Sequence, residues 1–180
     1  MKPLPVDVLA SAINASVNAA LDTTGIQATG VAVDSRDIKA GNVFCALAGE
    51  RVDGHDFAAA AIAAGAVAII TNRDIADVPC LVTDNSLEAL GRLAHWYRTH
   101  ELSATVIAVT GSSGKTTTKD LIADVLPGAV VAARGSFNPE VGVPLTILEA
   151  DPSPDSLVLE MGMRGVGPVP YTQLTLPTTP

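Results

Sequence analysis

The chain has 180 residues, of which 48% are hydrophobic and 17% are charged, and its formal net charge is −8. This composition excludes a disordered chain and supplies the core of one or two small domains. The acidic balance argues against nucleic acid and anionic membranes as partners, so any phosphate-bearing ligand must be held by local groups.

The first half of the chain alternates apolar runs of strand length with stretches of helical composition. Helical spacing of apolar residues predicts a helix over 6–17. Alanine, the strongest helix former, predicts a second helix over 56–64, with Gly65 placed to end it. Ser86 can cap a third helix that extends to about His100. Four short apolar runs predict strands over 26–33, 43–47, 67–71 and 81–83.

The second half starts with a new strand over 105–109, after a boundary near 101–104. The elements that follow are a helix over 120–126, a strand over 129–133, an apolar stretch over 141–148 and a strand over 157–159. Apolar runs that alternate with helices are typical of an α/β fold, in which helices cover the faces of a largely parallel sheet.

A glycine-rich loop between the strand 105–109 and the next helix is the most informative motif. Its glycines allow backbone N–H groups to converge on an anion, and the helix start adds free donors and a favourable dipole. Lys115 can neutralise terminal phosphates, and the Thr116 hydroxyl can ligate Mg²⁺. The loop therefore predicts a site for a nucleoside triphosphate. The residues that would line it are Gly111, Ser112, Ser113, Gly114, Lys115, Thr116 and Thr117.

The spacing of this loop departs from the strict Walker A pattern, which has four residues between its glycines. Only Ser112 and Ser113 separate Gly111 from Gly114. The short form still presents Gly-Lys-Thr after a strand and at a helix start. The alternative interpretation is a Gly-Ser turn before an ordinary helix.

Glu160 ends the last predicted strand, with Gly162 close behind. Ligands of open parallel sheets bind at the carboxyl ends of the strands, where a carboxylate can hold Mg²⁺. A solvated strand end is an equally good interpretation of this position alone.

Three further polar positions have simple structural explanations. Asp34-Ser35-Arg36 could offer a hydroxyl and a guanidinium to an anionic ligand, but a salt-bridged turn is the simpler interpretation. His55, in an Asp-Gly-His turn, is more often structural than catalytic. Lys119 and Asp120 are interpreted as solvated helix residues.

Two cysteines, Cys45 and Cys80, lie in or beside apolar runs. Core packing in a reducing compartment is therefore favoured over a disulfide. The N-terminus lacks a basic region followed by an apolar stretch, and no apolar run approaches about 18 residues. We expect a cytoplasmic location, no signal peptide and no membrane span.

Taken together, the motifs resemble the Mur ligases of bacterial cell-wall synthesis, over about residues 1–167. The matching segments are Asp34-Ser35-Arg36, Gly41–Leu47 with Gly49, Asp53–Phe57, Thr110–Lys119, Asn138 with Gly142-Val143-Pro144, and Glu160-Met161-Gly162. The family's short phosphate loop accounts for the Walker A mismatch. Gly-Ser-Ser-Gly-Lys-Thr and Glu-Met-Gly favour the branch of the family that adds D-alanyl-D-alanine.

This resemblance implies an ATP-dependent ligase that joins D-alanyl-D-alanine to UDP-N-acetylmuramoyl-tripeptide through an acyl phosphate. It implies catalytic roles for Lys115 and Glu160, and Mg²⁺ held by Thr116 and Glu160. It also implies that the UDP-sugar contacts Ser35, Arg36 and His55, and that full-length relatives are monomeric. The implied domains are a UDP-sugar-binding α/β domain over 1–102, an incomplete parallel-sheet P-loop ATPase domain over 103–167, and a poorly ordered non-family tail over 168–180.

The chain departs from the family pattern at two places. Pro139 stands where the family commonly has a second Asn, and nothing after Gly167 resembles the family. We therefore expect a truncated chain that is inactive alone. The alternatives are a Mur ligase that adds a single amino acid and a non-catalytic module that binds a UDP-sugar or nucleotide. A small P-loop kinase is disfavoured, because it would not need the first domain.

Overall fold

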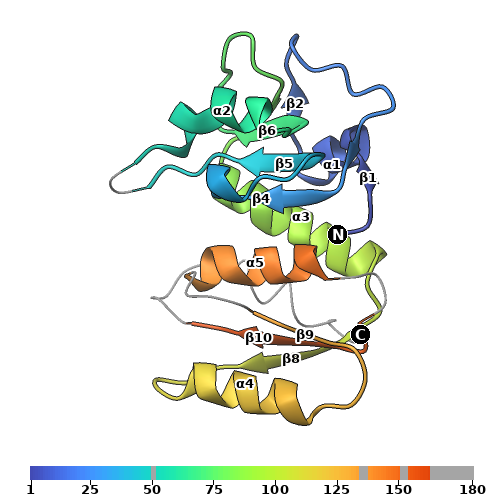
Figure 1. Cartoon of the computed structure of the whole chain (residues 1–180), viewed down its shortest axis with the longest axis vertical. Coiled ribbons are helices and arrows are strands. Elements are labelled where there is room, and N and C mark those ends of the chain that lie inside the picture. The colour runs from blue at the N-terminus through green and yellow to red at the C-terminus, as the bar shows by residue number, and fades with distance from the viewer. Residues whose placement is uncertain (50–51, 134–137, 151–153, 163–180) are drawn as a thin grey trace. The chain divides into compact units, whose positions relative to one another are not determined.

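The computed structural model describes residues 1–49, 52–133, 138–150 and 154–162 (Figure 1). The chain divides into two compact units, Met1–Leu93 (unit 1) and Ala94–Pro180 (unit 2). The division falls inside helix α3 (Ser86–His100), whereas the sequence places it after this helix, at 102. The predicted tail at 168–180 lies outside the described residues.

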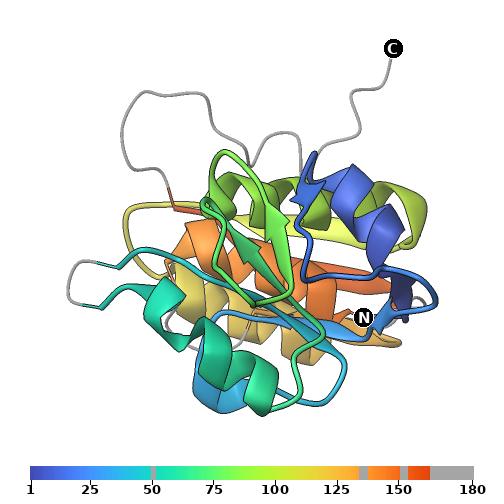
Figure 2. The same ribbon diagram turned by 90° about the horizontal axis from the view of Figure 1, so that it is seen from above.

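Unit 1 is built on a five-stranded sheet with the order β2-β7-β6-β5-β4. Strands β4 to β7 are parallel to one another, and β2 pairs antiparallel with β7 at one edge. Figure 2 shows α2 on one side of this sheet and α1 and α3 on the other. The bounds are α1 (Val6–Ala12), β2 (Ser16–Val17), β4 (Gly30–Ala32), β5 (Asn42–Cys45), α2 (Ala58–Ala63), β6 (Ala68–Thr71) and β7 (Cys80–Val82). The predicted α/β class is confirmed.

Two sequence predictions in unit 1 were wrong in extent. The helix predicted over 6–17 ends at Ala12, because Asn14 adopts a left-handed conformation with φ of 55° that a continuing helix excludes. The strand predicted over 26–33 is two strands. Leu4–Pro5 (β1) pairs with Gln27–Ala28 (β3) in a separate antiparallel ribbon, and only β4 joins the main sheet.

The core of unit 1 forms between α2 and the central strands. Phe44 of β5 and Ile69 of β6 pack there against alanines of α2. Cys45 and Cys80 are both buried as free thiols, and burial raises the pKa of the Cys45 thiol to about 12. Both cysteines are therefore core residues, as the sequence predicts.

Helix α3 has a different cap from the one predicted. The Oδ1 of Asn85 accepts hydrogen bonds from the backbone N–H groups of Leu87 (3.0 Å) and Glu88 (3.2 Å). Ser86 is a buried residue of the helix itself. Asn and Ser are about equally good caps, so composition alone does not separate two adjacent candidates.

Unit 2 has a three-stranded parallel sheet with the order β8-β10-β9. Helices α4 and α5 lie on opposite sides of it (Figure 1). The bounds are β8 (Thr105–Val109), α4 (Lys115–Val125), β9 (Val130–Ala132), α5 (Pro139–Glu149) and β10 (Ser156–Glu160). Because β10 lies between its neighbours, its carboxyl end is next to the loop that follows β8.

The apolar stretch at 141–148 is helix α5. Its residues from Val143 to Leu148 are all buried, so no polar face shows a helical period in the sequence. Pro139 occupies its first position, where a missing N–H costs nothing. None of the helices in the described part of the chain is long and apolar enough to cross a membrane.

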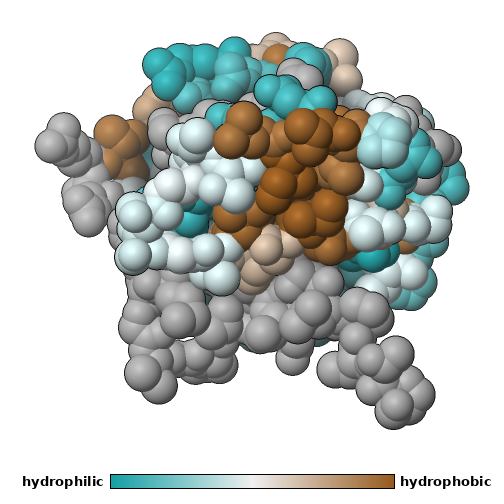
Figure 3. Space-filling view, turned by 90° about the horizontal axis from the view of Figure 1, so that it is seen from below, coloured by the Kyte–Doolittle hydropathy of each residue, from teal (hydrophilic) through white to brown (hydrophobic). Residues whose placement is uncertain are grey.

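Helix α4 exposes two large apolar side chains. Leu121 and Val125 are both exposed. Figure 3, viewed from below, shows a hydrophobic area in the middle of that face of the molecule. The same helix carries Lys119, which is buried. The two exposed apolar side chains and the buried lysine depart from the usual pattern of an amphipathic helix.

The last turn of α3 carries a ring stack. Trp96 and His100 lie with their ring centroids 4.6 Å apart and their planes 12° apart. Both residues belong to unit 2.

Candidate functional site

The glycine-rich loop of unit 2 connects β8 to α4 at the carboxyl end of the sheet. Gly114 has a φ of 74° and directly precedes Lys115, the first residue of the helix. A Cβ at Gly114 would meet no atom within 4 Å, so the backbone conformation, and not space, is what favours glycine. Residues Gly111 to Gly114 are exposed, which leaves their backbone N–H groups accessible to an anion.

Lys115 folds back over the loop that it follows. Its Nζ donates a hydrogen bond to the carbonyl oxygen of Gly111, at 2.9 Å. This contact holds the ammonium group above the cradle formed by the loop. A phosphate in the cradle would meet a cation already in place.

Thr116 and Glu160, 44 positions apart in sequence, meet beside this loop. The Oγ1 of Thr116 donates a hydrogen bond to Oε2 of Glu160, at 2.8 Å. The parallel pairing of β10 with β8 places Glu160 opposite Val109, and the Met161 N–H donates to the Val109 carbonyl at 2.9 Å. The strand register therefore fixes the carboxylate next to the start of α4.

This hydroxyl–carboxylate pair fits Mg²⁺. Magnesium in phosphate sites usually takes one or two protein oxygens and completes its shell with water and phosphate oxygens. Within the described residues there is no group of three or more His, Cys, Asp and Glu that could hold a metal ion. Thr116 and Glu160 would therefore need phosphate oxygens to complete a magnesium site.

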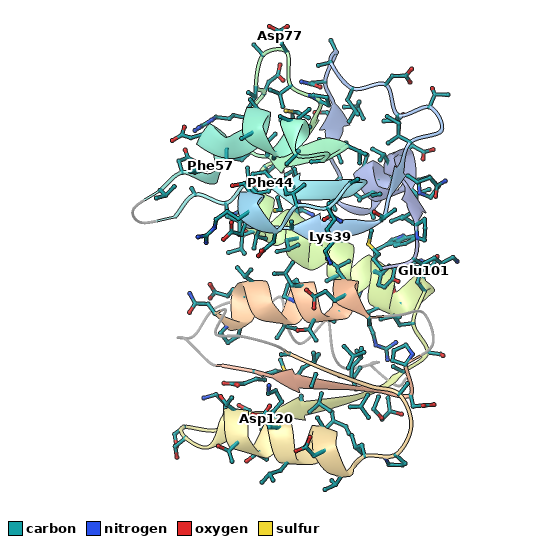
Figure 4. All side chains as sticks on the ribbon, viewed as in Figure 1. Lys39, Phe44, Phe57, Asp77, Glu101 and Asp120 are labelled. Carbon is teal, nitrogen blue, oxygen red and sulfur yellow. The ribbon has the colours of Figure 1, made fainter. Side chains whose placement is uncertain are left out.

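Lys119 lies inside unit 2, and the prediction that it is solvated was wrong. Its exposed fraction is 6%. Its Nζ donates to the carbonyl oxygen of Ala133 at 2.6 Å and lies 2.8 Å from Oδ1 of Asp120, which Figure 4 labels on α4. Lys119 thus ties the helix that follows the phosphate loop to the end of β9.

The start of α5 meets the residues that follow β10. A Cβ added at Gly162 would lie 2.9 Å from Cγ of Pro139, so only glycine allows this approach without a shift. The Asn138 carbonyl accepts the first helical hydrogen bonds, and its side chain makes no capping hydrogen bond. The Asn138-Pro139 and Glu160-Met161-Gly162 motifs are therefore adjacent.

In unit 1, the Asp34-Ser35-Arg36 motif forms a salt-bridged turn directly after β4. Oδ1 of Asp34 accepts from the Arg36 backbone N–H at 2.9 Å. Both Nε and Nη2 of the Arg36 guanidinium also donate to the Asp34 carboxylate. These bonds hold the pKa of Asp34 at about 2, mainly through the Arg36 side chain. Ser35 lies between them at the start of the short helix η1 (Ser35–Asp37).

His55 is buried in a second turn of the same kind, at the start of η2 (Gly54–Phe57). Its side chain is only 2% exposed, and its Nδ1 lies 2.5 Å from Oδ1 of Asp53. The His55 backbone N–H also donates to that oxygen, at 3.0 Å. Among the described residues the ring Nε2 has no hydrogen-bond partner. In this structure the His55 ring supports Asp53 from inside unit 1.

Arg73, which sequence analysis did not single out, completes this cluster. It follows β6, and its Nη2 donates to Oδ2 of Asp53 at 3.0 Å. Hydrogen bonds from His55 and Arg73 lower the pKa of Asp53 to about 2, the His55 backbone N–H contributing most. No local motif marks Arg73, because its partner lies 20 positions away in sequence.

The lowered pKa of Asp53 predicts acid sensitivity of unit 1. The ordinary pKa of this carboxyl is 3.8 and its folded value is about 2. The stabilisation from the charged form is therefore complete above pH 3.8 and is lost as the pH falls towards 2. Asp53→Asn should flatten the fall of the unfolding free energy over this range, measured by urea denaturation at stepped pH.

The matched control is Asp56→Asn, which removes an exposed carboxylate from the same turn. It should keep the wild-type pH dependence. An Asp53→Asn profile as steep as the wild-type profile would contradict the prediction.

Comparisons with known proteins cover most of the chain. The model of the Mur ligase family catalytic domain matches residues 27–98, and the model of the Mur ligase middle domain matches residues 109–178. The Escherichia coli UDP-N-acetylmuramoyl-tripeptide--D-alanyl-D-alanine ligase is 38% identical over 176 residues, which is 96% of this chain and 39% of that protein. The Bacillus subtilis enzyme of the same name is 42% identical over 146 residues, which is 78% of this chain and 32% of that protein.

Solved structures give the same result. Crystal structure I of MurF from Acinetobacter baumannii superposes with a TM-score of 0.82 at 33% identity, covering 91% of this chain and 36% of that one. MurF ligase from Thermotoga maritima in complex with ADP superposes with a TM-score of 0.67 at 38% identity, covering 74% of this chain and 32% of that one. The chain thus spans less than two fifths of the length of these relatives.

Proposed function

The chain belongs to the Mur ligase family, and from this premise we propose that it supplies the sugar-nucleotide unit and part of the ATP-binding unit of a ligase. The reaction would add D-alanyl-D-alanine to UDP-N-acetylmuramoyl-tripeptide, as the names of the relatives state. Because the reaction would consume ATP, we propose that it takes place in the cytoplasm. The observation that carries the proposal is the Thr116–Glu160 contact beside the Gly-Lys-Thr loop.

Unit 2 would hold ATP by its phosphates. The backbone N–H groups from Gly111 to Gly114, with Thr117 in the first turn of α4, would surround the phosphate oxygens. Lys115 would exchange its bond with the Gly111 carbonyl for oxygens of the β- and γ-phosphates. The ADP complex of the Thermotoga maritima relative supports an adenine nucleotide as the ligand.

The chemistry proposed is phosphoryl transfer followed by amide formation. The tripeptide carboxylate attacks the γ-phosphorus, ADP leaves, and an acyl phosphate remains. The amine of D-alanyl-D-alanine then attacks the acyl carbon and expels phosphate. Lys115 would stabilise negative charge on the transferring group, because such transfers depend on positioning and charge neutralisation. Thr116 and Glu160 would hold Mg²⁺, which when bound supplies further neutralisation of the phosphate oxygens.

Unit 1 would hold the UDP-sugar part of the substrate at the carboxyl ends of its parallel strands, the usual ligand edge of such sheets. Ser35 and Arg36 lie at this edge, directly after β4, and are proposed as contacts. His55 is proposed to act through Asp53, because its ring is buried.

Calorimetry with two ligands tests the function. We expect unit 1 to bind UDP-N-acetylmuramoyl-tripeptide and unit 2 to bind ATP with Mg²⁺, each without the other. Tight ATP binding with no binding of the sugar nucleotide would contradict the ligase assignment. A second experiment adds the domains that the relatives have and this chain lacks, and measures phosphate release that depends on D-alanyl-D-alanine. If the chain binds both ligands but no such release occurs, a non-catalytic binding module is favoured.

Glu160→Gln tests the proposed magnesium pair. The change keeps the size of the side chain but removes the charge that the metal requires. We expect the affinity for ATP in the presence of Mg²⁺ to fall about tenfold, corresponding to about 1.4 kcal/mol, and the affinity in EDTA to stay unchanged. Titration calorimetry under both conditions measures the difference.

The control is Glu149→Gln, which removes an exposed carboxylate at the end of α5. It should behave as wild type under both conditions. An equal loss for Glu160→Gln with and without Mg²⁺ would exclude a metal role for this residue.

A further inference from the structure

Two exposed guanidiniums stand at the carboxyl end of the unit 1 sheet. Arg36 follows β4 and Arg73 follows β6, and both strands are parallel neighbours of β5. Their carboxyl ends therefore reach the same edge; the arrowheads of β4 and β5 point the same way in Figure 1. Strands two apart in a sheet are separated by about 10 Å. Two arginine side chains can reach the same ligand across this distance.

The two arginines differ in how many of their guanidinium N–H groups are already hydrogen-bonded to carboxylates of the protein. Arg36 uses both Nε and Nη2 on the carboxylate of its own turn, Asp34. Arg73 makes one such bond, from Nη2 to Asp53, within the described part of the chain. A guanidinium has five N–H donors, so most of the Arg73 fork is available to a ligand. Its side chain is 56% exposed, whereas Asp53 below it is 34% exposed.

The backbone of Arg73 is held by a buried side chain. Thr71, the last residue of β6, is fully buried. Its Oγ1 donates to the Arg73 carbonyl at 2.7 Å and accepts from the Arg73 N–H at 3.2 Å. The Arg73 side chain is therefore attached to a fixed turn and aimed by a fixed carboxylate, which reduces the entropy lost when it binds.

Asp53 is held in turn from inside the unit. The buried His55 ring and the His55 backbone N–H both contact its Oδ1, which leaves Oδ2 for Arg73. The chain of contacts runs from a buried ring to a half-buried carboxylate and then to an exposed cation. A simple surface ion pair does not need buried residues to hold it in position. Side chains that bind ligands are commonly held in this way by the residues behind them.

We propose that Arg73, oriented by Asp53, is a phosphate-binding residue of unit 1 that contacts the diphosphate of the sugar nucleotide. The inference rests on the proposed function of unit 1. A chain with a net charge of −8 must attract a diphosphate through local cations. A planar guanidinium with a free edge can hold phosphate oxygens in a bidentate manner, which an ammonium group cannot.

Titration calorimetry with UDP and with uridine tests the inference on the whole chain. Arg73→Gln should weaken UDP binding by about 10- to 100-fold, as expected for the loss of charge-assisted bonds to phosphate. The same variant should bind uridine as wild type does, because uridine has no phosphate. Arg73→Lys should recover part of the lost UDP affinity, since it keeps the charge but not the fork. Asp53→Asn should lose less than Arg73→Gln.

Lys39→Gln is the matched control, because it removes one exposed positive charge before β5, at the amino end of the same sheet. It should leave both affinities unchanged. Unchanged UDP binding by Arg73→Gln, or equal losses for UDP and uridine, would overturn the role of Arg73 and leave the proposed function standing. Wild-type chain that binds neither UDP nor UDP-N-acetylmuramoyl-tripeptide would overturn the proposed function of unit 1 itself.

Discussion

Lys115→Ala is expected to lower the affinity for ATP by at least about a hundredfold. Hydrogen bonds to charged groups contribute about 1.5–3 kcal/mol each, and this ammonium would meet oxygens of two phosphates. Within the described residues the substitution removes one hydrogen bond of the side chain, from Nζ to the Gly111 carbonyl, and both groups are accessible to water. The fold should therefore be retained, and titration calorimetry with ATP would report the loss of binding alone.

Lys39→Ala removes an exposed lysine from unit 1 and serves as the control for a general effect of charge. It should bind ATP as wild type does. Unchanged ATP affinity in Lys115→Ala, in a chain whose thermal unfolding is also unchanged, would show that the loop does not bind the nucleotide.

Phe44→Ala is expected to lower the free energy of unfolding of unit 1 by about 3–5 kcal/mol. Phe44 is 1% exposed and belongs to the cluster between β5, β6 and α2. Removing its ring leaves a cavity in a cluster with many small side chains, since four of its buried members are alanines, Ala46, Ala58, Ala61 and Ala66. Urea denaturation followed by far-ultraviolet circular dichroism measures the loss.

Phe57→Ala is the matched control, because it makes the same change in the same unit at a side chain that is 39% exposed. Figure 4 labels both residues. The control should cost less than about 1 kcal/mol, as surface substitutions usually do. Similar losses in the two variants would mean that the cluster around Phe44 does not carry the stability of unit 1.

The phosphate loop and the Thr116–Glu160 contact were within reach of sequence reasoning. The loop is a local signal, and parallel strands bring their carboxyl ends to one edge whatever the order of the strands. The strand predictions therefore put Glu160 at the same edge of the sheet as the loop, and the family resemblance paired it with Thr116. The structure brings the two side chains to 2.8 Å. The α/β class followed from the same alternation of strands and helices.

Contacts that depend on register or on distant partners were out of reach. Lys119 is buried because the end of β9 offers it a carbonyl, which the composition of its own helix does not reveal. The Arg73 side chain is oriented by Asp53, which lies in the segment between β5 and η2. Helix α5 could not be assigned as helix or strand, because a run buried on all sides has no periodic pattern.

The ring stack at the end of α3 also has an experimental consequence. Trp96 is the single tryptophan of the chain, and Tyr97 and Tyr171 are its two tyrosines, so unit 1 contains neither residue type. Intrinsic fluorescence therefore reports on the end of α3 and on unit 2, whereas backbone signals report on both units. Melting curves recorded by the two methods would coincide only if the units unfold together.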